Sequence, residues 1–174
     1  MELLESDNHK ATIRRVQDFF LNENEYPTIR RRAGDWGLKS PLNDITGIHG
    51  SRRGNSSERN MIDYAEYVQA KRAVDNAIVG CSSSYRHPSQ QIIKYRYIQG
   101  LDLITIKERI NKFGNSTYQR AGDYACLEFA DCLEAMCERF NVDPAIIPDL
   151  HAKTGSKREE NRSKSGEKQE ANGK

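Results

Sequence analysis

The sequence predicts an all-α protein, a helical bundle with a C-terminal helix-turn-helix and with a flexible basic loop and tail. Apolar residues recur at helical spacing in three segments, 10–22, 57–79 and 89–140. Gly100 and Gly114 divide the last of these segments into three pieces. With 36% hydrophobic and 30% charged residues in 174, the core must be modest, which fits one domain with tails or two small helical lobes.

The first helix is expected from about Lys10 to Asn22, after a frayed stretch of nine residues. Its apolar set falls at helical spacing and consists of Ile13, Val16, Phe19, Phe20 and Leu21. The polar run 22–25 and then Pro27 end the helix.

Residues 28–60 have little periodicity and many Gly and Pro positions, which predicts a long irregular connection. Loops of this length are uncommon in compact domains unless they are functional or disordered. Six basic residues oppose two acidic ones between Arg30 and Arg53, so a mobile arm here could follow a DNA backbone or enter the minor groove. Trp36 is interpreted as an anchor of the loop, with a stacking contact as the alternative. We therefore group residues 1–54 as an N-terminal helix and basic arm.

Residues 57–79 turn helical again, with capping residues at 55–57. A helix of this length is about 33 Å long and could brace the rest of the bundle or form a homodimer seam. The apolar stripe expected to pack consists of Met61, Ile62, Ala65, Val68, Ala73, Val74, Ala77 and Ile78.

Residues 89–133 carry the predicted helix-turn-helix, within a helical domain of residues 55–150. The first helix ends at Gly100 and the second runs from about Leu103 to Phe113. The third begins after Asn115–Ser116, a good N-cap pair. Buried positions in the first two helices are predicted to be Ile92, Ile93, Tyr95, Tyr97, Ile98, Ile104, Ile106, Ile110 and Phe113. In this motif the start of the last helix enters the major groove of DNA.

The third helix has one face of small and apolar residues: Tyr118, Ala121, Gly122, Ala125, Phe129 and Leu133. A Gly in a helix interior costs about 1 kcal/mol relative to Ala. Gly122 therefore indicates either close packing of the second helix or a gap facing a groove. A plain three-helix bundle without a ligand is the alternative interpretation of the whole segment.

Positive charge concentrates on this segment. Between Arg86 and Arg120 there are seven basic and two acidic residues, a net charge of +5 in a chain whose total is +2. Such a concentration is typical of phosphate binding, although a solvated helix face would have the same composition.

Several classes of protein are disfavoured by the sequence. No apolar run approaches about 20 residues, and the acidic N-terminus does not resemble a signal peptide, so we expect a cytoplasmic protein without a membrane span. The four cysteines form no CxxC pair and the four histidines are scattered, so neither a metal nor a cofactor is expected. Neither a Gly-rich phosphate loop nor a nucleophile motif is present, and we expect no enzyme.

The C-terminal end has two parts. The segment NVDPAIIPDL, residues 141–150, is expected to pack back onto the third helix. Residues 151–174 have no large apolar side chain and are expected to be disordered. From residue 152 onward, seven basic residues against four acidic ones could attract nucleic acid weakly, or could serve solubility alone.

Five sequence features in consistent order carry a resemblance. These are RRRAG, then LKSP with nearby Asp44, then Asn55 and Glu58 opening a long helix, then IIKYRYI, and finally YACLEFA. Over roughly residues 26–134 the chain resembles the ArpU family of phage-type transcriptional regulators from Gram-positive hosts. Its C-terminal half is similar in pattern to the sigma-factor region that reads the −35 promoter element. The resemblance implies a phage- or prophage-encoded DNA-binding regulator of transcription, often an activator of late genes, acting at the nucleoid of a bacterial host cell.

The predicted DNA-binding residues lie on and around the start of the third helix. Arg120 can pair with guanine and Gln119 with adenine in bidentate fashion. The neighbouring residues expected to face outward are Ser116, Thr117 and Asp123, and the residues expected to hold phosphates are Arg96, Lys107 and Lys112. Asn115 and Ser116 combine capping with a phosphate contact, because helix starts favour anions. A surface ion pair of Arg120 with Glu108 or Asp123 is the alternative.

Double-stranded DNA is therefore the expected partner. We expect no contact with a membrane. Two alternative functions stay open, a small terminase-like DNA-packaging protein and a protein-binding module such as a partner of RNA polymerase, and an enzyme is a third that the sequence disfavours. The long helix also allows a homodimer.

Overall fold

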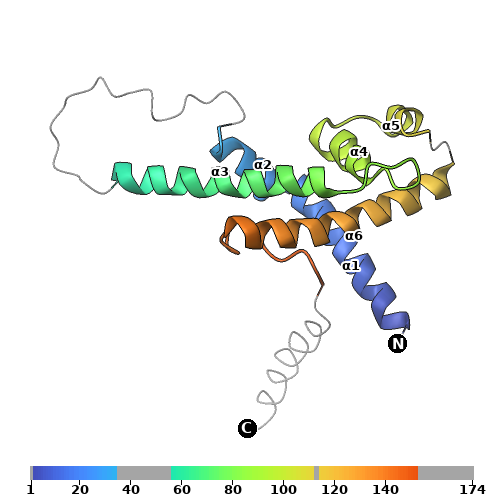
Figure 1. Ribbon diagram of the computed structural model, residues 1–174, viewed down its shortest axis with the longest axis horizontal. Coiled ribbons are helices and arrows are strands. Elements are labelled where there is room, and N and C mark those ends of the chain that lie inside the picture. The colour runs from blue at the N-terminus through green and yellow to red at the C-terminus, as the bar shows by residue number, and fades with distance from the viewer. Residues whose placement is uncertain (1, 35–55, 112–113, 153–174) are drawn as a thin grey trace, which may run out of the picture.

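The computed structural model describes residues 2–34, 56–111 and 114–152, and every regular element in these ranges is a helix (Figure 1). The predicted all-α class is thus confirmed. Most of the predicted basic arm, including Trp36, and the predicted disordered tail from residue 153 lie outside the described residues.

Two long helices, α3 (Ser56–Gly80) and α6 (Asn115–Phe140), form the frame of the fold and pack on each other more extensively than any other pair (Figure 1). Small side chains on α3 allow the close approach, since Ala70, Ala73 and Ala77 are all fully buried. At the end of α3, a Cβ added to Gly80 would lie 3.6 Å from the Cys132 sulfur of α6.

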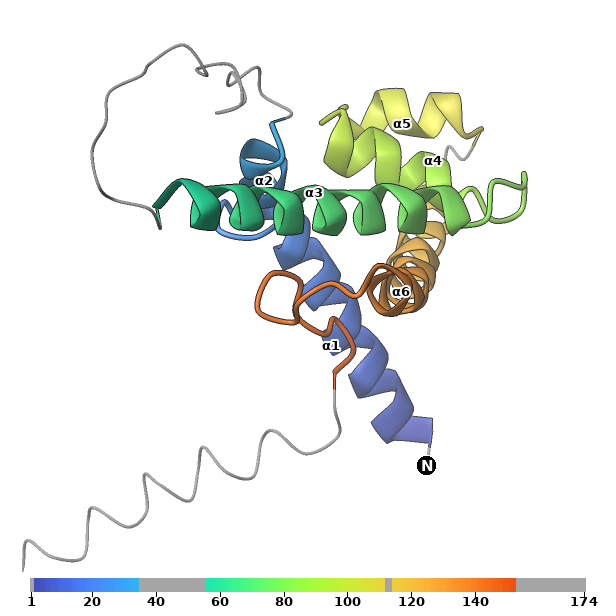
Figure 2. The same cartoon turned by 60° about the vertical axis from the view of Figure 1, so that its left-hand side comes forward.

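Helix α1 (Glu2–Leu21) packs on α6 and adds an aromatic cluster to the core (Figure 1, Figure 2). The Phe20 ring stacks on Tyr97, with centroids 4.8 Å apart, and lies 4.9 Å from the ring of Phe129. The helix begins eight residues before the predicted start at Lys10. The stretch that we expected to be frayed contains neither Gly nor Pro, so nothing in it stops a helix from extending toward the N-terminus.

A short helix, α2 (Tyr26–Arg32), occupies the start of the segment predicted to be irregular. The prediction was wrong here because only two side chains, Tyr26 and Ile29, are buried, too few to produce a visible period. Pro27 suits the first turn of a helix, where its missing N–H is not needed. Arg32 donates a hydrogen bond of 2.8 Å from its guanidinium to the Tyr67 hydroxyl and so ties α2 to α3.

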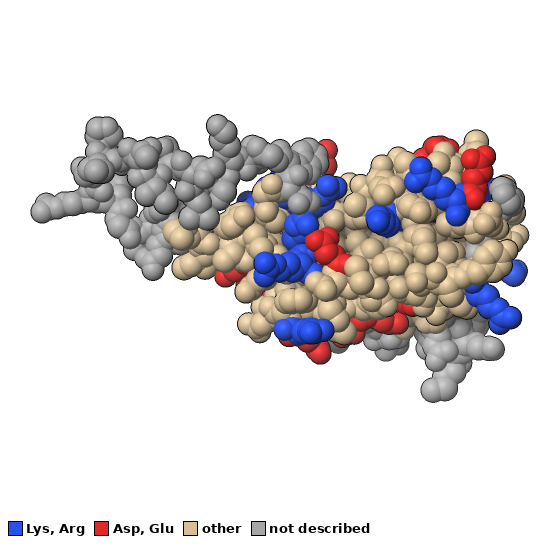
Figure 3. All heavy atoms as spheres, turned by 45° about the horizontal axis from the view of Figure 1, so that its top comes forward, with Lys and Arg blue, Asp and Glu red and all other residues tan. Residues whose placement is uncertain are grey.

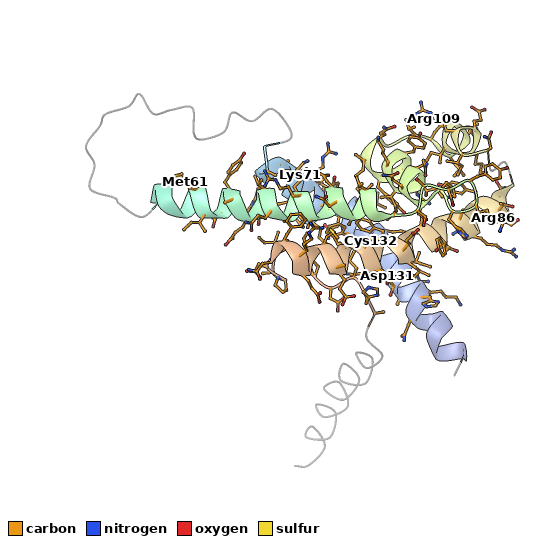
Figure 4. All side chains as sticks on the ribbon, viewed as in Figure 1. Met61, Lys71, Arg86, Arg109, Asp131 and Cys132 are labelled. Carbon is orange, nitrogen blue, oxygen red and sulfur yellow. The ribbon has the colours of Figure 1, made fainter. Side chains whose placement is uncertain are left out.

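The ends of α3 agree with the predicted range of 57–79 to within one residue, but part of its predicted apolar stripe is exposed. Met61 and Ile62 are 53% and 52% exposed, Ala65 is also exposed and Val68 is half-buried, so the predicted apolar stripe is buried only from Ala73 onward. Figure 4 shows Met61 near the far end of α3, beyond the helices that cover the other end.

Helix α4 (Ser89–Ile93) continues into a π-helical turn, η2 (Lys94–Ile98), and ends at Gly100, whose φ is +63°. Helix α5 (Leu103–Arg109) follows, with the Asp102 carboxylate accepting a 3.0 Å bond from the Thr105 N–H at its N-cap. These hydrogen bonds from Thr105 lower the pKa of Asp102.

Helix α5 is shorter than predicted, since Asn111 takes a left-handed φ of +55° and stops it before Phe113, which is outside the described residues. Ile106 and Ile110 are buried as predicted. Ile104 was predicted to be buried but is 70% exposed, because it faces away from the helices that α5 contacts.

Beyond α6, Asn141 adopts a left-handed φ of +50° and turns the chain back on itself. The predicted packing of residues 141–150 onto α6 is confirmed, since Ile147 and Leu150 are both buried in the core. The Ala152 N–H then donates a 3.1 Å bond to the Thr12 hydroxyl of α1. Among the described helices, none is long and apolar enough to cross a membrane.

Candidate nucleic-acid interface

The first two turns of α6 form an exposed tip at one end of the molecule (Figure 1). Tyr118 and Gly122 are buried there, whereas the side chains pointing outward are those of Asn115, Ser116, Thr117, Gln119 and Arg120. Asp123 is half-buried. The predicted tip residues are therefore accessible to a partner, apart from partial cover over Asp123.

The predicted N-cap pair is wrong by one position. Helix α6 begins at Asn115, and Gly114 takes the N-cap position without a side-chain capping bond. Asn115 instead accepts a hydrogen bond from Lys107 of α5, and the Lys107 ammonium lies 5.9 Å from the centre of the Tyr118 ring. Lys107 is thus placed beside the tip, while the predicted phosphate contact Lys112 lies outside the described residues.

The two predicted base-reading residues, Gln119 and Arg120, differ in whether their side chains already bond to a neighbour. The Gln119 side-chain amide donates a 2.9 Å bond to the Asp123 carboxylate four residues later. Arg120 is exposed, and within the described residues it makes neither of the ion pairs with Glu108 or Asp123 that were the alternative for it. Gln119 must give up a hydrogen bond to reach another partner, whereas Arg120 need not.

The helices around the tip are arranged differently from the expected motif. Helix α4 is the one that packs broadly on α6, while α5 contacts η2 and approaches the α6 backbone at few points. Besides Lys107, two further basic residues in this unit lie over aromatic rings. Arg96 is 5.3 Å from the centre of the Tyr97 ring, and Arg109 is 5.2 Å from that of Tyr95.

The positive charge is less concentrated in space than in the sequence. Figure 3 shows Lys and Arg side chains in separate groups over the face that carries α4 and α5, with Asp and Glu side chains among them. Figure 4 places Arg109 on the outer side near α5 and Arg86 beside the first half of α6, so these two basic residues lie apart from each other.

The sequence did not reveal one feature beside the tip, a groove with a volume of about 330 Å³. Its lining residues come from the turn before α4 and from one face of α6: Arg86, His87, Thr117, Arg120, Ala121 and Tyr124. The rings of His87 and Tyr124 are 4.6 Å apart at an angle of 40°. The spacing of Thr117, Arg120 and Tyr124, three and then four residues apart, was the available signal that they share a helix face.

The turn before α4, residues 81–88, forms one wall of this groove and is attached to α6 by Glu128. The Glu128 carboxylate accepts hydrogen bonds from the N–H and the hydroxyl of Ser82, the former at 2.9 Å. Burial by itself would raise the pKa of Glu128, but the hydrogen bonds from Ser82 oppose it and the pKa is lowered. The His87 N–H donates a 3.1 Å bond to the Ser84 hydroxyl within the same turn.

The thiols and carboxylates do not form a metal centre in the described part of the chain, where no three such side chains or histidines come together suitably. All four cysteines are free thiols. Burial raises the pKa of Cys81 far above its usual range, and it raises that of Cys126 to about 11. Comparison of the chain with known protein families, with curated proteins and with solved structures found no match.

Proposed function

We propose that this protein is a sequence-specific DNA-binding regulator of transcription, encoded by a phage or prophage, that reads DNA with the tip of α6. The observation that carries the proposal is Arg120, an exposed guanidinium at the start of a long helix that makes no ion pair with a described residue. Arg is the side chain that most often reads guanine in the major groove, through two parallel hydrogen bonds.

In this mechanism the tip enters the major groove with Thr117 and Arg120 toward the base edges. Lys107, held beside the tip by its bond to Asn115, contacts a phosphate and fixes the register of the helix. Arg96 sits on the Tyr97 ring and contacts the backbone from the neighbouring η2 turn. Gln119 reads a base only after exchanging its bond to Asp123 for one to an adenine.

The test is recovery of bound fragments from the genome that encodes the protein, at low and at moderate salt, followed by affinity measurements on a recovered site. Arg120→Ala should weaken binding by about 1–3 kcal/mol and relax preference at one base pair. Arg139→Ala is the matched control, because Arg139 is an exposed arginine on the last turn of the same helix. An equal loss on every sequence would make Arg120 a phosphate contact, and no enrichment of any fragment would reject the proposal.

Lys107 gives an independent test. Lys107→Gln should reduce the slope of log affinity against log salt by about one unit and leave sequence preference unchanged. An unchanged slope would remove Lys107 from the interface.

A second candidate is an oligomeric DNA-packaging protein or a module that binds RNA polymerase. Two exposed apolar side chains of α3 favour it, because Met61 and Ile62 lie on the part of this helix that extends beyond the body (Figure 1). A ring-sized species on a sizing column would favour packaging, and polymerase binding without DNA binding would favour the module.

A further inference from the structure

We infer that the groove between the Arg86–His87 turn and α6 binds a single unpaired nucleotide of a nucleic-acid strand, with the base against the aromatic rings and the phosphate between the two arginines. The inference rests on nucleic acid as the ligand of the proposed function and shares Arg120 with it. It adds a site that duplex recognition by the α6 tip does not require.

The aromatic wall supplies a surface for a base. Tyr124 is 44% exposed although its ring contacts His87, so part of the tyrosine ring faces the groove and the solvent. Bases stack on such rings whatever their identity, because each base has a flat π face. A groove of about 330 Å³ lies at the lower end of the range for small-molecule sites, which suits one nucleotide.

The charges around the groove suit a phosphate. Arg86 and Arg120 line it from two different elements, and neither makes an ion pair with a described residue. Asp123 and Glu128 of α6 accept hydrogen bonds from Gln119 and Ser82 and keep their negative charge. Neither carboxylate forms an ion pair with Arg86 or Arg120, so both guanidinium groups can pair with a phosphate. Figure 4 shows Arg86 beside the first half of α6, pointing outward.

The wall opposite α6 is held in place before any ligand binds. The turn is pinned to α6 through Ser82 and Glu128, and Pro88 and Ser89 at the start of α4 are buried. A preformed site loses less conformational freedom on binding, which favours affinity. This distinguishes the groove from the exposed apolar end of α3, which carries Met61 and Ile62 and for which the described residues form no pocket.

The experiment measures binding of the full chain to a fluorescein-labelled 12-nucleotide oligothymidylate and to a blunt 20-base-pair duplex of mixed sequence. Wild type should bind the single strand. Tyr124→Leu, which keeps apolar bulk but removes the stacking surface, should weaken that binding about 5- to 100-fold and change duplex binding less than about twofold. Tyr124→Phe should retain it. Arg86→Gln should lower the salt slope on the single strand by about 0.7 units.

The matched control is Tyr85→Leu, because Tyr85 is 74% exposed in the same turn but does not line the groove. It should leave single-strand affinity unchanged. Absence of oligothymidylate binding overturns the inference, and so does an equal loss for Tyr85→Leu and Tyr124→Leu. If neither wild type nor any variant bound the duplex, but single-strand binding persisted and depended on Tyr124, the proposed function would be rejected and the groove would stay as assigned. Thermal unfolding of each variant separates lost binding from lost structure.

Discussion

The first two turns of α6 and the middle of the same helix differ in what fixes them. From Ala125 to Leu133 the inward face is buried against α1, α3 and α4, and Phe129 is completely inaccessible. From Asn115 to Arg120 only Tyr118 is buried, and the other side chains contact mainly solvent or each other. One continuous helix therefore serves both as core and as exposed tip.

The comparison shows that the orientation of the tip is fixed by the core contacts of the middle of α6. A helix of this length cannot rotate its first turns independently of its middle, so the core contacts determine the direction in which Arg120 points. Changes in the middle should alter stability strongly, and changes at the tip should alter binding with little cost in stability.

The largest effect is expected for Phe129→Ala. Phe129 is fully buried and its ring lies 4.9 Å from Phe20 and 6.5 Å from Phe19, so truncation leaves a cavity at the junction of α1 and α6. We expect the free energy of unfolding to fall by about 3–5 kcal/mol, measured by urea denaturation. Phe129→Leu is the control and should cost less than the Ala variant. Similar small losses for both would mean that the middle of α6 is no better packed than its tip.

A smaller effect is expected for Glu128→Gln, which weakens the attachment of the Ser82 turn. We expect a loss of about 1–2 kcal/mol at pH 7, because hydrogen bonds to a charged acceptor are weakened. The pKa of Glu128 is lowered in the folded state, so its contribution is fully present above the unfolded pKa, about 4.3.

This contribution should disappear as the pH falls through the lower, folded pKa. The stability difference between wild type and Glu128→Gln should therefore close in acid. Urea denaturation from pH 7 to pH 3 measures this, with Glu138→Gln, an exposed carboxylate on the same helix, as the control expected to show little difference. A gap that stays constant through acid would mean that the charge of Glu128 contributes nothing.

The smallest effect is expected for Gly122→Ala, at the border between the two halves of α6. Among the described residues, no heavy atom outside the helix's own backbone lies within 4 Å of a Cβ added there, so they do not pack closely on this glycine, which was one interpretation of it. We expect a gain of up to about 1 kcal/mol from helix propensity, measured by thermal unfolding. Gly100→Ala should do the opposite, since its φ of +63° is strained for a residue with a side chain. A loss at position 122 would show that the tip needs the missing side chain.

The sequence was most informative where a periodic pattern coincided with burial. The buried face of α6 from Tyr118 to Leu133, the break at Gly100 and the return of residues 141–150 were all predicted. The sequence did not predict that Met61 and Ile62 would be exposed. The spacing of apolar residues identifies the apolar face of a helix, but it does not show whether another helix packs against that face. The helix from Tyr26 to Arg32 was missed since it has only two buried residues.

The candidate site could be predicted only in part for a similar reason. Exposure of Thr117 and Arg120 follows from their place opposite the apolar face of one helix. The contact of His87 with Tyr124 joins residues far apart in the sequence, and it depends on the turn that Glu128 holds. The bond between Gln119 and Asp123 was not anticipated, although their spacing of four residues is the one that brings side chains together on a helix.

The buried thiols of Cys81 and Cys126 can report local opening of the structure around them. A thiol whose ionisation is suppressed by burial reacts slowly with alkylating reagents until the structure around it opens. Cys81 follows the end of α3 and interacts with Cys132 of α6, and the Cys126 sulfur lies 3.9 Å from the Tyr97 hydroxyl. The alkylation rate of each thiol would therefore measure how often the structure opens locally at that position, without any engineered probe.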